Sequence, residues 1–294
     1  MRIALDLLSP WARILEWAAL PLGLEVERVP PDADLSGYDL LLRFSPEVFE
    51  GDERAHPGRR AIEAYADLLI QKRLFRALGI PTPPFGRVTN PAEWEAMVRV
   101  NGLPAWLKDR KGRRAERVDA PGFEPPPGSF LYERALPFEA ELLLLAVRDA
   151  RGGVHLGPAA RREGKAWRAP APLPEKADRH LAHLLGALSH TGGLEVRAGL
   201  LGGEVYFLDF APFPTARSLY LPAFAEAHLR AVLGHAVPEL LLSRPAALVP
   251  APSREAALEL PFAHPFILER PYARIEAADE AALDARIQAL GGDA

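Results

Sequence analysis

Residues 66–109 are the stretch that most constrains the fold of this chain. Apolar residues at helical spacing predict a helix that ends at Gly79, where glycine is a typical C-cap. Three prolines within the next five residues exclude further helix there. Asn90 followed by Pro91 is a strong start signal for a second helix, after which a buried strand carries Lys108. The stretch therefore predicts a helix, a stiff crossing, a short strand, a second helix and another strand.

Composition excludes several classes of protein. The chain has 294 residues, 49% of them hydrophobic, and a formal net charge of −4. This length can bury a large core, and the weakly acidic balance argues against nucleic acid as a partner. The absence of cysteine excludes disulfides, thiolate metal sites and cysteine nucleophiles. Charged residues interrupt the apolar run near the N-terminus, so we expect a cytoplasmic protein with no membrane partner.

The N-terminal residues indicate a parallel arrangement of strands. Residues 2–8 are predicted to form a buried strand, residues 10–22 an amphipathic helix, and residues 24–29 and 38–42 two further strands. The order strand, helix, strand implies a βαβ unit with parallel strands. The predicted fold class is therefore α/β.

The second half of the chain carries a hairpin signal and two helices. Residues 194–200 and 204–210 are predicted strands joined across Gly202-Gly203, a strong hairpin signal. Residues 175–190 and 279–290 are predicted helices. His180 and His183 are three residues apart on the first of these helices. No further ligand is evident, so we interpret them as exposed helix residues and not as a metal pair.

The motif order in residues 66–109 resembles the ATP-grasp superfamily. "KRLFRALGIPTPPF", then a helix, then "LPAWLK" is similar to the entry into the nucleotide site of that superfamily, and "AALPLGLEV" (18–26) matches the end of its first helix. The likeness is greatest to carboxyaminoimidazole ribonucleotide synthase, the ATPase subunit of phosphoribosylaminoimidazole carboxylase. The resemblance implies an α/β ATP-grasp architecture with α+β lobes. Its expected parts are an N-terminal βαβ domain (1–79), a small lobe (80–134) and a large lobe with a C-terminal extension (135–294).

The resemblance implies nucleotide-binding roles for four residues, with ATP as the ligand. Lys72 on the first helix and Lys108 on the strand would reach the phosphates. Only five of the 35 basic residues are lysines, so lysine at both places exceeds what composition supplies; the alternative is two surface lysines. Glu133 would accept a hydrogen bond from the adenine edge, and Glu141 would accept hydrogen bonds from the ribose hydroxyls, because an ionised carboxylate is an acceptor only.

The metal motif departs from the family pattern. The resemblance places two acidic magnesium ligands twelve residues apart on the hairpin, and these positions hold Arg197 and Asp209. Glu195 lies two residues from Arg197. A cation at a ligand position puts magnesium in doubt. We hypothesise that Arg197 pairs with Asp209 and supplies the charge of the ion; the alternative is that Arg197 points to solvent. A two-residue turn would set Arg197 opposite Leu208, so the pairing needs an odd-length loop or a bulge.

The remaining family motifs are kept only in part. In the closing motif, which contacts phosphate and substrate in the family, Arg270 and Arg274 can be carried over. The glycine-rich turn after the first strand is replaced by residues 9–13, which contain no glycine. Backbone without glycine cannot approach a phosphate as closely. The resemblance is therefore poorest on the substrate side.

Two functions are compatible with this pattern. The first is a diverged ATP-grasp protein without the parent reaction, which keeps a nucleotide site for binding, regulation or scaffolding. The alternative is an active ATP-dependent carboxylate–amine ligase or carboxylase-type enzyme on another substrate, forming an acylphosphate that an amine attacks. The loss of one metal carboxylate argues against the alternative, because this chemistry depends on cationic stabilisation of the transferred phosphoryl group. Both imply a nucleotide or small-molecule ligand, and the family resemblance implies a homodimer.

Overall fold

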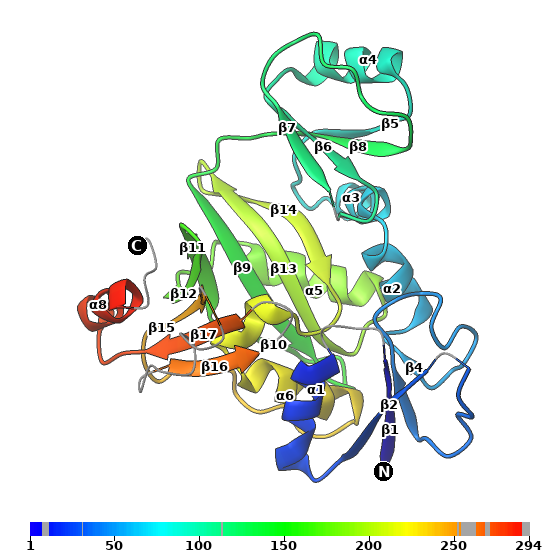
Figure 1. The fold of residues 1–294 in the computed structure, drawn as a ribbon, viewed down its shortest axis with the longest axis vertical. Helices are drawn as coiled ribbons and strands as arrows, with labels where there is room; N and C mark the ends of the chain where they lie inside the picture. The colour runs from blue at the N-terminus through cyan, green and yellow to red at the C-terminus, as the bar shows by residue number, and fades with distance from the viewer. Residues whose placement is uncertain are drawn as a thin grey trace.

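Three β-sheets organise the part of the chain that the computed structural model describes, residues 1–7, 12–30, 32–112, 114–251, 253, 263–267 and 271–289. A small sheet with helix α4 stands at one end of the molecule (Figure 1). A large sheet occupies the centre, and the N-terminal sheet lies at the opposite end from α4 (Figure 1). The architecture is mixed α/β, as the sequence predicts.

The N-terminal sheet is parallel and has the strand order β2-β1-β3-β4. This confirms the predicted strand–helix–strand unit. The strands are β1 (Arg2–Asp6), β2 (Glu25–Val29), β3 (Leu40–Leu42) and β4 (Ala55–His56). The helices are α1 (Ala12–Ala19), the 3-10 turn η1 (Leu20–Leu22) and α2 (Arg59–Tyr65).

The small sheet is antiparallel, with the order β5-β8-β6-β7. Helix α3 precedes it, and Asn90 caps helix α4 by accepting a hydrogen bond from the Glu93 amide (2.9 Å), as the sequence predicts. Trp94 and Tyr132 pack in a separate core beneath α4. The elements are α3 (Leu68–Ala77), β5 (Phe85–Val88), α4 (Pro91–Asn101), β6 (Ala105–Asp109), β7 (Ala115–Val118) and β8 (Phe130–Arg134).

The large sheet has the order β14-β13-β9-β11-β12-β15-β17-β16, with β10 paired to β9. Its first members are β9 (Ala140–Arg148), β10 (Val154–Leu156), β11 (Ala159–Glu163) and β12 (Ala166–Ala171). The others are β13 (Gly192–Leu201), β14 (Glu204–Ala211), β15 (Ala246–Pro250), β16 (Ala263–Ile267) and β17 (Pro271–Glu276). Its helices are α5 (Ala177–Ala187), the 3-10 turn η2 (Ala216–Tyr220), α6 (Ala223–Val232) and α8 (Glu280–Ala289).

Helices α5 and α6 cover opposite faces of the large sheet. Alternate residues of β9 belong to different cores: Leu143 and Leu145 pack in the core that contains α6, whereas Leu142 and Leu144 pack in the core that contains α5. A strand that is buried on both faces shows no alternation of polar and apolar residues, and β9 accordingly contains four consecutive leucines. Among the described residues, no helix has the length and apolar character needed to cross a membrane.

Candidate functional site

Two lysines from different elements meet on one buried glutamate. Lys72 on α3 has a fully buried side chain, and its Nζ lies 2.6 Å from Glu133 Oε2. Lys108 on β6 places its Nζ 2.5 Å from Glu133 Oε1. Lys72 also donates to Thr82 Oγ1 at 3.0 Å and to the Phe207 carbonyl at 3.3 Å. The two lysines are therefore not separate surface residues, and Glu133 holds them together.

Electrostatics in this group follow from burial and from the pairing of charges. Burial lowers the pKa of Lys72 to about 8, although Glu133 opposes the shift. Burial acts to raise the pKa of Glu133, but the two ammonium groups outweigh it, and the pKa is lowered. The Glu133 carboxylate is therefore ionised and occupied by two cations. In this structure it is not free to accept a hydrogen bond from the adenine edge of a nucleotide.

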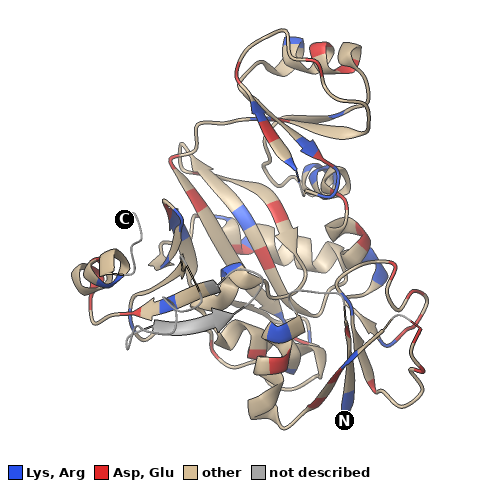
Figure 2. Cartoon of the chain, viewed as in Figure 1, with Lys and Arg blue, Asp and Glu red and all other residues tan. Residues whose placement is uncertain are grey.

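A second charged group lies on β13, β14 and β9, where basic and acidic positions are neighbours (Figure 2). Arg197 Nε donates to Asp209 Oδ2 at 2.8 Å, and its Nη1 donates to Glu141 Oε1 at 3.2 Å. Arg217 reaches Asp209 Oδ1 at 3.5 Å, and Arg162 donates to Glu141 Oε2 at 3.0 Å. The hypothesised pair of Arg197 and Asp209 is present, and Glu141 joins it.

A β-bulge makes this pairing geometrically feasible. The hairpin turns at Gly202-Gly203, where both glycines have positive φ (58° and 79°), and Ala198 lies opposite Phe207. The register then shifts by one residue, so that Arg197 lies opposite Asp209 and Leu208 is the extra residue. The sequence predicts the turn, and it identifies a bulge as one of two ways to bring the pair together.

The two charged groups influence each other. Burial acts to raise the pKa of Asp209, but the charges of Arg197 and Arg217, with a smaller contribution from Lys108, outweigh this effect. The pKa of Asp209 is therefore lowered. Asp209 raises the pKa of Arg197 most, and Glu141 and Glu133 add to the shift. The structure therefore brings Lys72, Lys108, Glu133, Glu141 and Asp209 into one electrostatic neighbourhood.

The carboxylates at the metal position are all in contact with hydrogen-bond donors of the protein in this structure. Both Asp209 oxygens and both Glu141 oxygens contact guanidinium groups. Glu195 is almost fully buried, and Thr215 donates to it from Oγ1 at 2.6 Å and from its amide at 3.1 Å. Magnesium needs several oxygen ligands in octahedral order. In this structure the Arg197 guanidinium lies between Asp209 and Glu141, the two carboxylates that could supply them.

Arg274, one of the two arginines of the closing motif, does not join this neighbourhood. Arg274 on β17 binds elsewhere: its Nε donates to the Tyr220 carbonyl at 2.8 Å, and its guanidinium pairs with Glu276. Its contacts tie β17 to η2. Arg270 lies outside the described residues.

Sequence reasoning missed Arg217, Arg162 and Thr82, all of which contact the predicted residues. Arg217 lies two residues after Thr215, whose side chain caps η2 by accepting a hydrogen bond from the Arg217 amide at 3.2 Å. Threonine is a common N-cap residue, so the sequence did carry a signal for a helical turn beginning there. Arg162 and Thr82 carry no signal in the sequence, because their partners are distant in the chain.

A cavity of about 490 Å³ lies in a different place, beside β4 and α2. Acidic side chains and the two arginines Arg43 and Arg59 line it. None of the sequence-predicted residues lines this cavity, so it is separate from the charged groups above.

Comparisons of the sequence and of the structure with known proteins find similar enzymes. No protein-family model matches the sequence. Formate-dependent phosphoribosylglycinamide formyltransferase of Nitratidesulfovibrio vulgaris (strain Miyazaki F) is 30% identical over 268 residues, covering 80% of this chain and 67% of that protein. The crystal structure of N5-carboxyaminoimidazole ribonucleotide synthetase from Thermus thermophilus matches with a TM-score of 0.83 at 25% identity, covering 99% of this chain and 98% of that one. Carboxyaminoimidazole ribonucleotide synthase from Aspergillus clavatus, complexed with ATP, shares the fold (TM-score 0.83, 18% identity, 98% and 97% coverage).

Proposed function

Because this chain belongs to the ATP-grasp superfamily, alongside the ATP-dependent purine-biosynthesis enzymes that it resembles, we propose that it binds a nucleotide such as ATP. Lys72 and Lys108 support this proposal. Two ammonium groups converge on one carboxylate, Glu133. Phosphate oxygens are anions that the same two groups can bind in its place. In the ligand-free protein Glu133 offsets one of the two positive charges, and a nucleotide phosphate would take its place.

We also propose that the protein has lost the parent reaction and serves as a nucleotide-binding or regulatory protein. The observation that carries this is Arg197, whose guanidinium lies between Asp209 and Glu141. Catalysis of phosphoryl transfer depends on metal ions that bridge the phosphates and neutralise developing charge. A guanidinium held by two carboxylates supplies one fixed charge and cannot bridge two phosphate groups as an ion does. We therefore expect nucleotide binding that does not require magnesium. A cytoplasmic homodimer stays the expectation for the whole protein.

A thermal-shift titration with ATP, ADP and AMP, in magnesium or in EDTA, tests the binding proposal. A ligand at 100 times its Kd stabilises by about 2.7 kcal/mol, which gives a visible rise in Tm. We expect ATP to raise the Tm equally in both buffers. Lys72→Met should weaken binding by about 10- to 100-fold, the range of a lost charge-assisted hydrogen bond, whereas Lys111→Met, at an exposed lysine, should not. No shift with any nucleotide would contradict the proposal.

The alternative is an active ATP-dependent ligase, and the persistence of Lys72, Lys108 and Glu133 as one buried group favours it. Phosphate release from Mg-ATP separates the two. One assay contains aminoimidazole ribonucleotide with bicarbonate, and a second contains phosphoribosylglycinamide with formate. We expect no more phosphate than in a blank. Turnover of about 1–100 s⁻¹, ordinary for enzymes, would establish the ligase instead.

A further inference from the structure

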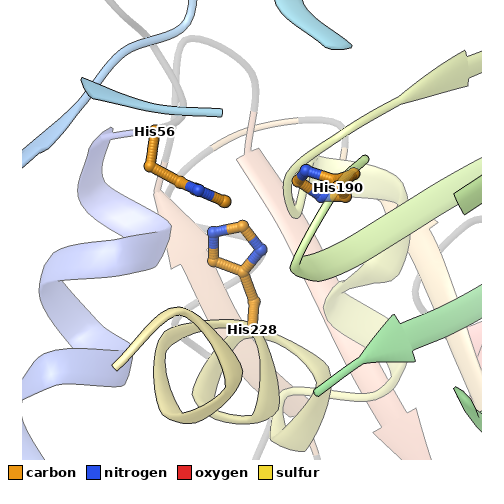
Figure 3. A group of neighbouring side chains, drawn as sticks. All are labelled: His56, His190 and His228. Atoms are coloured by element: carbon orange, nitrogen blue, oxygen red, sulfur yellow. The ribbon is translucent and has the colours of Figure 1, made fainter. Parts of the chain in front are cut away.

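Three histidines from separate elements meet away from the charged groups. His56 is on β4, His190 is in the turn between α5 and β13, and His228 is on α6 (Figure 3). One ring nitrogen from each lies within 4.8 Å of the other two, and within the described ranges no other group of three such residues has this property. The His56 and His190 rings stack with centroids 5.1 Å apart. His190 and His228 are each 1% exposed. The residues face one another inside the protein.

Two of the ring nitrogens are buried and have no hydrogen-bond partner: His56 Nε2 and His190 Nδ1. His190 Nε2 lies 3.0 Å from the Gly193 carbonyl and donates to it, which leaves a lone pair on Nδ1. A backbone carbonyl that accepts from one ring nitrogen while the other is free is the usual arrangement of a metal-binding histidine. Buried polar atoms without a partner are rare in folded proteins, and a ligand at this point would give both nitrogens one.

His228 is oriented by the same glycine. The Gly193 amide donates to His228 Nδ1 at 2.8 Å, so the ring proton sits on Nε2. Binding of an ion through Nε2 therefore displaces that proton to water and leaves the ring as an imidazolate, whose Nδ1 still accepts from the Gly193 amide.

We propose that His56, His190 and His228 bind one divalent transition-metal ion of the zinc class, with water as a fourth ligand. Imidazole nitrogen is a ligand for zinc, copper, nickel and cobalt, whereas magnesium and calcium prefer oxygen. An ion central to three nitrogens within 4.8 Å of one another lies at most about 2.8 Å from each, and Zn–N bonds of ~2.0–2.1 Å require shifts of about 0.7 Å. Small rotations of the side chains supply such shifts.

The ion would tie the N-terminal sheet to the large sheet. His56 comes from the edge strand of the first sheet, and His228 from the helix that packs on the second. No carboxylate belongs to the group, and Arg43 and Arg148 lie near enough to lower the pKa of His56 and of His190, respectively. Those two cations oppose a bound dication. We therefore expect weaker binding than at a site that includes a carboxylate.

Three substitutions remove one ligand nitrogen each and keep the local hydrogen bonds. His190→Gln keeps a donor for the Gly193 carbonyl and loses Nδ1. His228→Asn keeps an acceptor for the Gly193 amide and loses Nε2. His56→Asn loses Nε2. His183→Asn, at an exposed histidine of α5, is the matched control.

The full chain is stripped with EDTA, which is then removed, and titrated with Zn²⁺ by calorimetry and with Co²⁺ by visible absorption. We expect one equivalent of Zn²⁺, a rise in Tm, and Co²⁺ bands of four-coordinate geometry. Each ligand substitution should weaken binding at least about tenfold, whereas His183→Asn should leave it unchanged. Wild-type protein without these Co²⁺ bands would overturn the proposal, whether or not a variant folds. Unchanged affinity in any of the three folded ligand variants, or an equal loss in His183→Asn, would also overturn it.

Discussion

At the scale of single residues, two carboxylates of the candidate site are each shared between two cations. Lys72 and Lys108 share Glu133, and Arg197 and Arg217 share Asp209. Removing a carboxylate from water is costly unless opposite charge and hydrogen bonds compensate. Removal of one cation therefore leaves part of the carboxylate charge uncompensated, and the prediction for Arg197 depends on this.

Substitution of Arg197 by glutamate should create a cation site. Arg197→Glu places a third carboxylate beside Asp209 and Glu141, and the lost pair should cost about 3–5 kcal/mol in EDTA. Magnesium should restore the Tm of this variant, and ATP should bind to it only when magnesium is present. A thermal-shift titration measures both effects. Arg162→Glu, at a more exposed partner of Glu141, is the control and should gain no magnesium response. If Arg197→Glu gains none either, the site has diverged at more than one residue.

Burial of Glu195 should make the free energy of unfolding depend on pH. Burial raises the pKa of Glu195 above its ordinary value of 4.5. The folded state therefore holds this proton more tightly, and the stabilisation from protonated Glu195 is lost as pH rises through the folded pKa. Glu195→Gln cannot ionise, so its stability relative to wild type should increase from pH 4 to pH 7.

Urea unfolding at several pH values measures this difference. Glu204→Gln, at an exposed glutamate of β14, is the control for the loss of one carboxylate. A flat profile for Glu195→Gln would mean that Thr215 and Arg217 keep the carboxylate ionised in spite of burial.

At the scale of elements, the position of α3 against β6 decides where Lys72 and Lys108 meet. Asp67 caps α3 by accepting from the Leu69 amide at 2.9 Å, and it pairs with Arg110 in the turn after β6. The Leu68 amide donates to the Arg110 carbonyl at 2.8 Å. One aspartate thus begins the helix and joins it to the strand that carries the second lysine.

Two substitutions separate these roles of Asp67. Asp67→Ala removes the cap and the ion pair, and should destabilise by about 1–2 kcal/mol. Asp67→Asn keeps a good cap and loses only the half-exposed pair, so it should cost less than about 1 kcal/mol. Urea unfolding measures both, and ATP affinity should fall in the same order. Equal destabilisation by the two variants would assign the whole effect to the ion pair.

At the scale of the whole molecule, the N-terminal sheet and the large sheet share one core, whereas the small sheet has its own. Ile3 and Leu15 pack in the same cluster as Leu145 of β9 and Phe224 of α6. Trp94 belongs to the core beneath α4. Elements that share a core unfold together, and those that do not can open separately.

Native-state hydrogen exchange should reveal this division. Leu15→Ala should destabilise by about 2–5 kcal/mol and lower the protection of β1 and β9 together. Trp94→Ala should cost about 3–5 kcal/mol and lower protection in β5–β8 only. Loss of protection across all three sheets in Trp94→Ala would show one cooperative unit instead.

Local and periodic features of the fold could be predicted from the sequence. Capping by Asn90, the glycine turn at 202–203 and the strand–helix–strand order of the N-terminus depend on neighbouring residues, so the chain alone determines them. The family resemblance singled out Lys72, Lys108 and Asp209 as candidates, since these lie within motifs. Strands β10–β12 and β15–β17 and helix α6 were not predicted, because short apolar segments carry little periodicity.

Contacts between distant residues were decided only by the tertiary structure. The bulge at Leu208 arises where β13 must pair with β14 and β9 at once, and no local pattern selects it over an odd-length loop. Glu133 binds both lysines because packing buries all three charges together, which no spacing reveals. His56, His190 and His228 are far apart in the chain and come from a strand, a turn and a helix. Sequence determines which elements form, whereas the burial of charge depends on which elements pack against one another.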